Sequence, residues 1–187
     1  YYYGQKKIIN NQMSKKKNNS EIINELLSKA VSFHRQNKHK NAENLYLDVI
    51  KKHKNNPDAN HNLAILKVSQ NKFNEASPLF KIAIQTNPYE EQYWISYVDL
   101  LLKEKKFKDA KEICKKALLT MPNSHIIYNS FGISNHYSND LKQAEINFNK
   151  SIELKKDFFV AYYNLGNLFS DTGRYKEAEI FYKKAIE

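Results

Sequence analysis

Apolar side chains along this chain recur at intervals of three and four residues. Near the C-terminal end, Tyr162, Leu165 and Phe169 follow one another with this spacing. Such spacing places apolar groups on one face of a helix, whereas a half-buried strand would alternate apolar and polar residues. Short polar segments, such as residues 70–72 and 138–140, separate the apolar stretches. The pattern therefore predicts helices joined by short turns, and the low content of four Gly and four Pro favours the same all-α fold class.

The helical pattern repeats with a period of 34 residues, and each period holds two apolar stretches around a polar turn. Each unit is therefore predicted to be a helix–turn–helix pair. One pair cannot bury its apolar surface alone, so neighbouring pairs must stack. The predicted organisation is a basic, disordered tail at 1–22, followed by units at 23–56, 57–90, 91–124, 125–158 and a truncated unit at 159–187.

Two positions of the repeat predict how the paired helices pack. A small-residue position in the first helix holds Ala30, Ala64, Val98, Gly132 and Gly166. A large-residue position in the second helix holds Tyr46, Phe80, Cys114, Phe148 and Tyr182, and an alanine stands four residues before each of them. Small residues let two helix axes approach closely, and rings fill the space beside them.

These positions resemble the tetratricopeptide repeat, whose signature is W-x₂-L-G-x₂-Y followed by A-x₃-F and P. The last unit matches it with Tyr162-x₂-Leu165-Gly166-x₂-Phe169 and Ala178-x₃-Tyr182. The resemblance covers residues 23–187 and implies a right-handed superhelical solenoid of tandem helix–turn–helix units. The sequence departs from the pattern where polar residues replace expected apolar ones, at Lys29, Asn60, Lys67 and Asn135. We expect the units that hold them to pack less well.

The resemblance also implies where a partner would bind. In this family the first helices line a concave groove that receives an extended peptide or a partner's helix. Placing the sequence in that frame gives six candidate groove residues: Asn62, Asp99, Asn129, Tyr163, Asn164 and Asn167. Amide side chains can donate to and accept from a peptide backbone without adding charge. The groove lacks the Lys and Arg ring with which some family members clamp a C-terminal carboxylate, so that kind of ligand is not expected.

The charge of the chain changes this picture little. The formal net charge is +10, from 28 Lys and two Arg against 20 acidic residues, and +8 of it lies in residues 1–56. Phosphate recognition favours Arg, whose planar fork binds bidentately, so nucleic acid is not an expected partner. Met13, which precedes the basic run at 15–17, is a plausible true start of the protein.

The sequence indicates no catalytic residue, cofactor or metal. Cys114 occupies the large-residue position, where we expect a buried, inert thiol. The six His residues lack metal-site spacing, and no Gly-rich phosphate loop occurs. No run of eighteen apolar residues could span a membrane, and no signal-peptide core precedes the repeats. We therefore expect a cytoplasmic protein without a membrane partner.

Two functions remain open at this point. The first is a protein–protein interaction scaffold that binds an extended peptide or partner helix in its groove. The second is the substrate-recruiting arm of a larger enzyme, with a catalytic domain after residue 187. The steps Asn62-Leu63-Ala64 and Asn164-Leu165-Gly166 look like those in the repeat arm of protein O-GlcNAc transferases. A sulfotransferase or methyltransferase fusion is a further candidate. Whether the full-length protein is an enzyme, and its oligomeric state, are left open.

Overall fold

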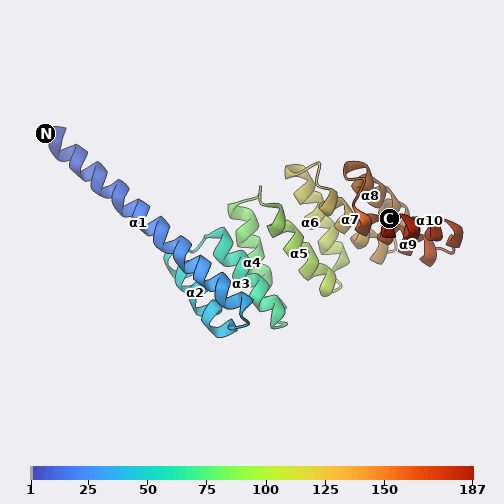
Figure 1. Cartoon of the computed structure of the whole chain (residues 1–187), viewed down its shortest axis with the longest axis horizontal. Helices are drawn as coiled ribbons and strands as arrows, with labels where there is room; N and C mark the ends of the chain where they lie inside the picture. Colours follow the sequence, from blue (N-terminus) through green and yellow to red (C-terminus); the bar gives the residue numbers. More distant parts are fainter. Residues whose placement is uncertain (1) are drawn as a thin grey trace. The chain divides into compact units, whose positions relative to one another are not determined.

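The computed structural model describes the backbone of residues 2–187 and the side chains from residue 19 onward. These residues form helices and no strand (Figure 1). In chain order the helices are α1 Tyr2–Arg35, α2 His39–Lys52, α3 Pro57–Ser69, α4 Phe73–Thr86, α5 Glu91–Lys103, α6 Phe107–Thr120, α7 His125–Tyr137, α8 Leu141–Leu154, α9 Phe159–Asp171 and α10 Tyr175–Ile186. The sequence prediction of a disordered tail at 1–22 falls mostly on residues 1–18, which lie outside the described side chains. Residues 19–22 belong to α1.

The helices α3, α5, α7 and α9 begin at residues 57, 91, 125 and 159, which are the first residues of the repeat frame. Local chemistry explains two of these starts. The side chain of Asn56 accepts a hydrogen bond from the N–H of Ala59 at 2.8 Å, and Pro57 supplies a suitable φ for the first turn. Ser124 caps α7 in the same way, through the N–H of Ile127 at 3.1 Å.

The turn inside each helix pair contains a residue in the left-handed region. These residues are Asn37, Asn71, Lys105, Asn139 and Gly173. The amide that follows each of them bonds back to the preceding helix; the N–H of Arg174, for example, donates to the carbonyl of Phe169 at 2.8 Å. This closure is the Schellman motif, which satisfies carbonyls that a helix end would leave unpaired. Gly and Asn tolerate this φ, which explains the Asn-rich turns of the sequence.

The small-residue and large-residue positions meet across each helix pair. A β-carbon placed on Gly132 would lie 2.5 Å from ring carbons of Phe148, and one on Gly166 would lie 2.6 Å from ring carbons of Tyr182. At such distances an added β-carbon would force the facing ring to shift, so these glycines allow the observed approach of α7 to α8 and of α9 to α10. In the third unit the sizes are reversed, because Val98 and the smaller Cys114 are both buried there.

Three of the four polar departures from the repeat pattern are buried with partners, and Lys29 is exposed. The ammonium of Lys67 lies 2.7 Å from a carboxylate oxygen of Glu43 and 2.6 Å from one of Glu75. The amides of Asn60 and Asn135 donate to backbone carbonyls of their own helix or the preceding turn. These bonds offset part of the cost of burying polar groups at apolar positions, since Oδ1 of Asn60 and Oδ1 of Asn135 are buried without a hydrogen-bond partner among the described residues.

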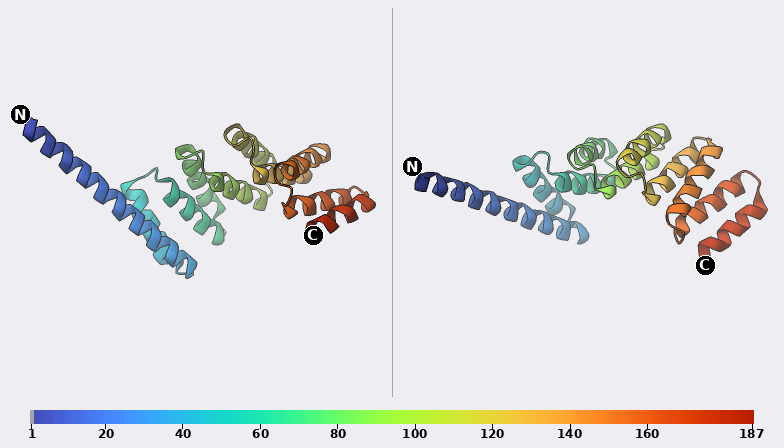
Figure 2. Two further views of the ribbon diagram at one scale, coloured as in Figure 1. Left: turned by 45° about the horizontal axis from the view of Figure 1, so that its top comes forward. Right: turned by 90° about the horizontal axis from the view of Figure 1, so that it is seen from above.

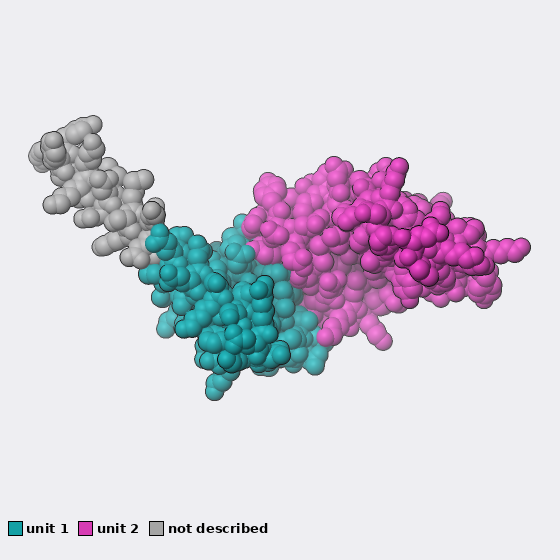
Figure 3. All heavy atoms as spheres, viewed as in Figure 1, with its two compact units in different colours: residues 1–86 teal, residues 87–187 magenta. Residues whose placement is uncertain are grey.

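The chain divides into two compact units, Tyr1–Thr86 and Asn87–Glu187, which Figure 3 colours separately. The core of the first unit gathers around Ala42, Tyr46 and Leu63 from α1 to α4. A core of the second unit gathers around Phe148 and Leu165, and α9 and α10 lie side by side over it (Figure 2).

Candidate functional site

The first helices of the pairs form one continuous surface in the second unit. Helix α5 contacts α7, and α7 contacts α9, whereas no such contact joins α6, α8 and α10 within the described residues. In a curved stack of helices, the more closely spaced row lies on the inside. We call this surface the inner face, and it carries Asp99, Asn129, Tyr163, Asn164 and Asn167.

Two amides of the inner face bond to each other across neighbouring repeats. Nδ2 of Asn164 donates to Oδ1 of Asn129 at 2.9 Å, and Asn129 is 5% exposed. This bond fixes which end of the Asn164 amide points outward. Its Oδ1 makes no hydrogen bond to a described residue and is therefore available as an acceptor.

One turn further along α9, Asn167 has the opposite orientation. The hydroxyl of Tyr182 donates to Oδ1 of Asn167 at 2.9 Å, which leaves the Nδ2 group without a partner among the described residues. The ring of Tyr182 also packs near that of Tyr163, with centroids 5.8 Å apart. Tyr182 therefore holds Asn167 as a donor and supports an exposed aromatic ring beside it.

Asn164 and Asn167 open into a cavity of about 270 Å³. Its walls are the last turns of α7 and α9 and the rings of Phe148 and Tyr182. These two last turns are joined by a side-chain contact, in which Nε2 of His136 on α7 lies 3.0 Å from Oδ2 of Asp171 on α9. The cavity is thus mainly polar, and Asn and Asp side chains supply its hydrogen-bonding groups.

A second, apolar hollow of about 480 Å³ lies beside this cavity between α9 and α10. Its lining residues are Phe159, Val160, Tyr163, Tyr182, Ala185 and Ile186. The ring of Tyr182 lines both spaces, so a polar and an apolar recess adjoin on the same side of α9.

Asp99 lies on α5 and differs from the other inner-face residues in being ionisable. Its side chain is exposed, yet desolvation by the surrounding protein raises the pKa of its carboxyl. Burial raises the pKa of the Cys114 thiol to about 12; the side-chain hydrogen bond with Ser134 opposes this rise, and the charge of Asp99 adds a smaller increase. Cys114 is buried and stays protonated at neutral pH, as expected for an inert core thiol.

The structure brings together four of the six residues predicted for the groove: Asn129, Tyr163, Asn164 and Asn167. Asp99 lies in the same unit but does not line the cavity. Asn62 is half-buried on α3, which belongs to the first unit. Sequence reasoning missed Tyr182, because it lies on a second helix, and the pair His136 and Asp171. An acidic residue at the end of a helix was the available signal for Asp171.

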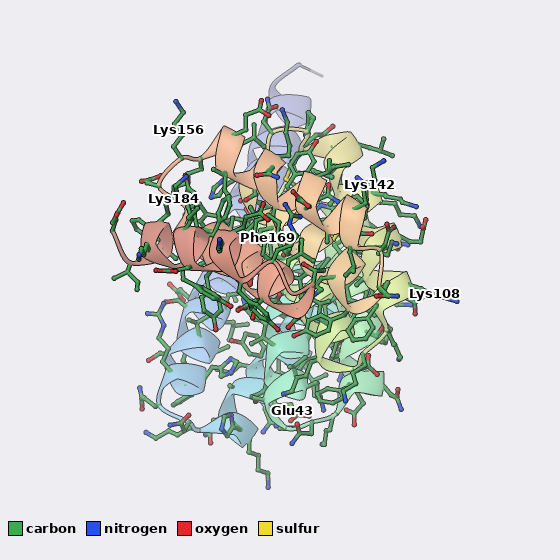
Figure 4. All side chains as sticks on the ribbon, turned by 90° about the vertical axis from the view of Figure 1, so that its right-hand side faces the viewer. Glu43, Lys108, Lys142, Lys156, Phe169 and Lys184 are labelled. Atoms are coloured by element: carbon green, nitrogen blue, oxygen red, sulfur yellow. The ribbon has the colours of Figure 1, made fainter. Side chains whose placement is uncertain are left out.

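The described part of the chain gives no support for a metal site or a membrane span. Within it, no three His, Cys, Asp or Glu side chains gather as metal ligands would. None of its helices combines the length and the apolar character that crossing a bilayer requires. Several lysines simply extend into solvent, and Figure 4 shows Lys108 and Lys156 pointing away from the helices of the second unit.

Comparison with known proteins identifies one tetratricopeptide repeat at the C-terminal end of the chain. The family model for the tetratricopeptide repeat matches residues 159–187. No curated protein matches the chain. The family model thus covers the last helix pair, which is also the pair with the best match to the repeat signature.

Solved structures extend the similarity of fold to most of the chain. PilF of Pseudomonas aeruginosa is 15% identical, with a TM-score of 0.77 over 89% of this chain and 76% of that one. MamA of Desulfovibrio magneticus RS-1 is 16% identical, with a TM-score of 0.75 over 88% and 93%. YrrB, described as a tetratricopeptide-repeat protein with an unusual peptide-binding site, is 19% identical, with a TM-score of 0.67 over 86% and 83%.

These structures confirm the all-α repeat fold expected from the sequence. At these identities they establish the fold alone. None of the comparisons supports the alternative that the chain is the recruiting arm of an enzyme similar to O-GlcNAc transferase.

Proposed function

We propose that this protein is an interaction scaffold that binds an extended segment of a partner protein on the inner face of its second unit. The observation that carries the proposal is the opposite orientation of two neighbouring amides on α9. Asn164 offers an acceptor and Asn167 offers a donor, and each is held in place by a hydrogen bond to another side chain.

This pair matches the polar groups of an extended peptide. Residues three apart on a helix lie on the same face, about 5–6 Å from each other. In an extended chain the N–H and C=O of one residue point to the same side, as they do in an antiparallel ladder. One residue of the peptide could therefore donate to Oδ1 of Asn164 and accept from Nδ2 of Asn167. Such contacts would bind the backbone and leave the peptide's side chains to set specificity.

The adjoining recesses support the same proposal. The apolar hollow beside Tyr163, which is 54% exposed, suits an apolar side chain of the bound segment. The polar cavity suits a polar one. The fold shared with YrrB, whose description names a peptide-binding site, supports a peptide as the ligand class.

Selection from a library of random twelve-residue peptides, followed by fluorescence anisotropy, tests this function. We expect enrichment of peptides that bind the wild-type chain, and a loss of about tenfold in their affinity in Asn164→Ala with Asn167→Ala, since two hydrogen bonds are removed. Asn149→Ala is the matched control, because Asn149 is exposed on α8. Thermal melts would show that all variants fold. Selected peptides that bind the double variant as tightly as the wild type would contradict the proposal, and so would a failure to enrich any peptide.

A further inference from the structure

Two helix ends of the same electrical sign meet at the polar cavity. Helix α7 ends at Tyr137 and α9 ends at Asp171, and the last turns of both line the cavity. The aligned peptide dipoles place partial negative charge at a helix C-terminus, and here this holds although the closing turns pair the last carbonyls. The two helix ends therefore contribute negative potential at the cavity before any side chain is considered.

Asp171 makes this potential more negative, against the usual preference of a helix end. A cation in the last turn is stabilising and an anion is not. At the corresponding position of the earlier repeats stand Arg35, Ser69, Lys103 and Tyr137. Asp171 is the acidic exception among these residues. Its helix has no basic residue in the last turn to offset the unfavourable charge, and such an uncompensated departure points to a functional site.

His136 compensates Asp171 only in part. It contacts Oδ2, whereas Oδ1 makes no hydrogen bond or ion pair with a described residue, and the carboxylate side chain is 65% exposed. No Lys or Arg lines the cavity. Oδ1 of Asn164 is a further outward-facing acceptor on the same side of α9. An unpaired carboxylate oxygen and an amide oxygen at a negative helix end together favour a cationic group.

The cavity has the size of a side chain. At about 270 Å³ it is smaller than the usual range of roughly 300–1,000 Å³ for sites that hold a whole small molecule. Ile133 and Tyr137 provide apolar wall at its edge, against which the methylene stem of a long side chain can pack.

We propose that this cavity is a subsite for a cationic side chain of the bound segment, with Arg preferred to Lys. The planar fork of Arg can donate to Oδ1 of Asp171 and also to Oδ1 of Asn164, whose second lone pair remains for the peptide backbone, whereas the ammonium of Lys acts as a point charge. The inference rests on the proposed function, since it assumes that the neighbouring Asn164 and Asn167 hold the peptide backbone. It adds that bound segments carry a basic residue at the position that enters the cavity.

Three capped pentapeptides provide the test, with Arg, its uncharged isostere citrulline, or Ala between pairs of alanines. Each is titrated into the ¹⁵N-labelled chain, and the side-chain amide signals of Asn164 and Asn167 are followed. We expect the Arg peptide to bind about tenfold more tightly than the citrulline peptide. Asp171→Asn should abolish this difference, and higher salt should reduce it. Asp157→Asn is the charge-matched control, because Asp157 is exposed and outside the cavity lining, and it should retain the difference.

The outcomes separate this inference from the function on which it rests. Equal binding of the Arg and citrulline peptides, with shifts at Asn164 and Asn167, would overturn the cationic subsite and leave the peptide-binding face intact. A preference for Arg that survives Asp171→Asn would also overturn it, and would show that Asp171 serves only to pair with His136. If no peptide shifts either amide signal at millimolar concentration, both the subsite and the binding face are contradicted.

Discussion

The glycine at the small-residue position is required by the ring that it faces. Gly132 lies against Phe148, which is fully buried, and Gly166 lies against Tyr182, which is half-buried. A fully buried ring is held by neighbours on every side, whereas a half-buried one can shift towards solvent. The same clash should therefore cost more at Gly132 than at Gly166.

We expect Gly132→Ala to lower the free energy of unfolding by about 1–3 kcal/mol, the usual cost of overpacking a core. This loss should exceed the gain of about 1 kcal/mol that Ala brings to a helix interior. Gly166→Ala should lower it by less. Urea denaturation of the two variants measures both effects.

A second substitution separates the clash from other effects of the added methyl group. Phe148→Leu removes the ring, so Gly132→Ala should be tolerated better in its presence than alone. If the two substitutions are simply additive, the small-residue position is not set by the ring, and the interpretation of the repeat register at this point is wrong.

At the scale of the elements, an ion pair recurs between a second helix and the turn residue just before the next second helix, with its charges reversed. Nζ of Lys111 lies 3.2 Å from Oδ2 of Asp140, and Nη1 of Arg174 lies 2.8 Å from Oε2 of Glu145. Residues 111 and 145 are equivalent in the repeat, as are residues 140 and 174. The stacking of the repeats therefore brings these two positions together, and the ion pair forms with the positive charge at either position.

Exchanging the charges of one pair tests this equivalence. Lys111→Glu or Asp140→Arg alone places like charges together, and each should destabilise the chain. The double variant reproduces the Glu145–Arg174 arrangement and should recover most of the loss. Because the groups are partly exposed, we expect a coupling energy of about 0.5–1 kcal/mol that shrinks in high salt. A double-mutant cycle by urea denaturation measures it. A coupling of zero at low salt would show that the pair does not link the repeats.

At the scale of the whole molecule, the sequence predicted what is periodic and missed what depends on a particular contact. The starts of α3 and α9 coincide with the repeat frame, because apolar spacing and turn residues act locally. The sequence placed Asn164 and Asn129 on the same surface but did not predict the hydrogen bond between them. The donor role of Asn167 could not be expected at all, because it depends on the hydroxyl of Tyr182, fifteen residues away on another helix. Such contacts set the orientation of a side chain, and the 34-residue repeat of the sequence does not reveal them.

The number of neighbours that each helix contacts also predicts how stability is distributed within the second unit. Helix α7 packs against α5, α6, α8 and α9, whereas among the described residues α10 packs against α9 alone. In a repeat protein, stability is close to a sum of terms from each repeat and each interface between neighbours. In the chain of 187 residues, the opening that exposes the amides of α10 to exchange should therefore cost the smallest free energy, and the opening that exposes those of α7 the largest.

Native-state hydrogen exchange measures this gradient helix by helix. Tyr182 lies on α10, so its opening removes the hydroxyl that orients Asn167. We therefore expect a bound peptide, which needs Asn167 as a donor, to slow exchange in α10 more than in α7. Uniform protection of α7 and α10 in the free chain would mean that the unit unfolds as one cooperative block. In that case the binding face could not be lost by local opening of the last helix, and peptide binding would protect both helices equally.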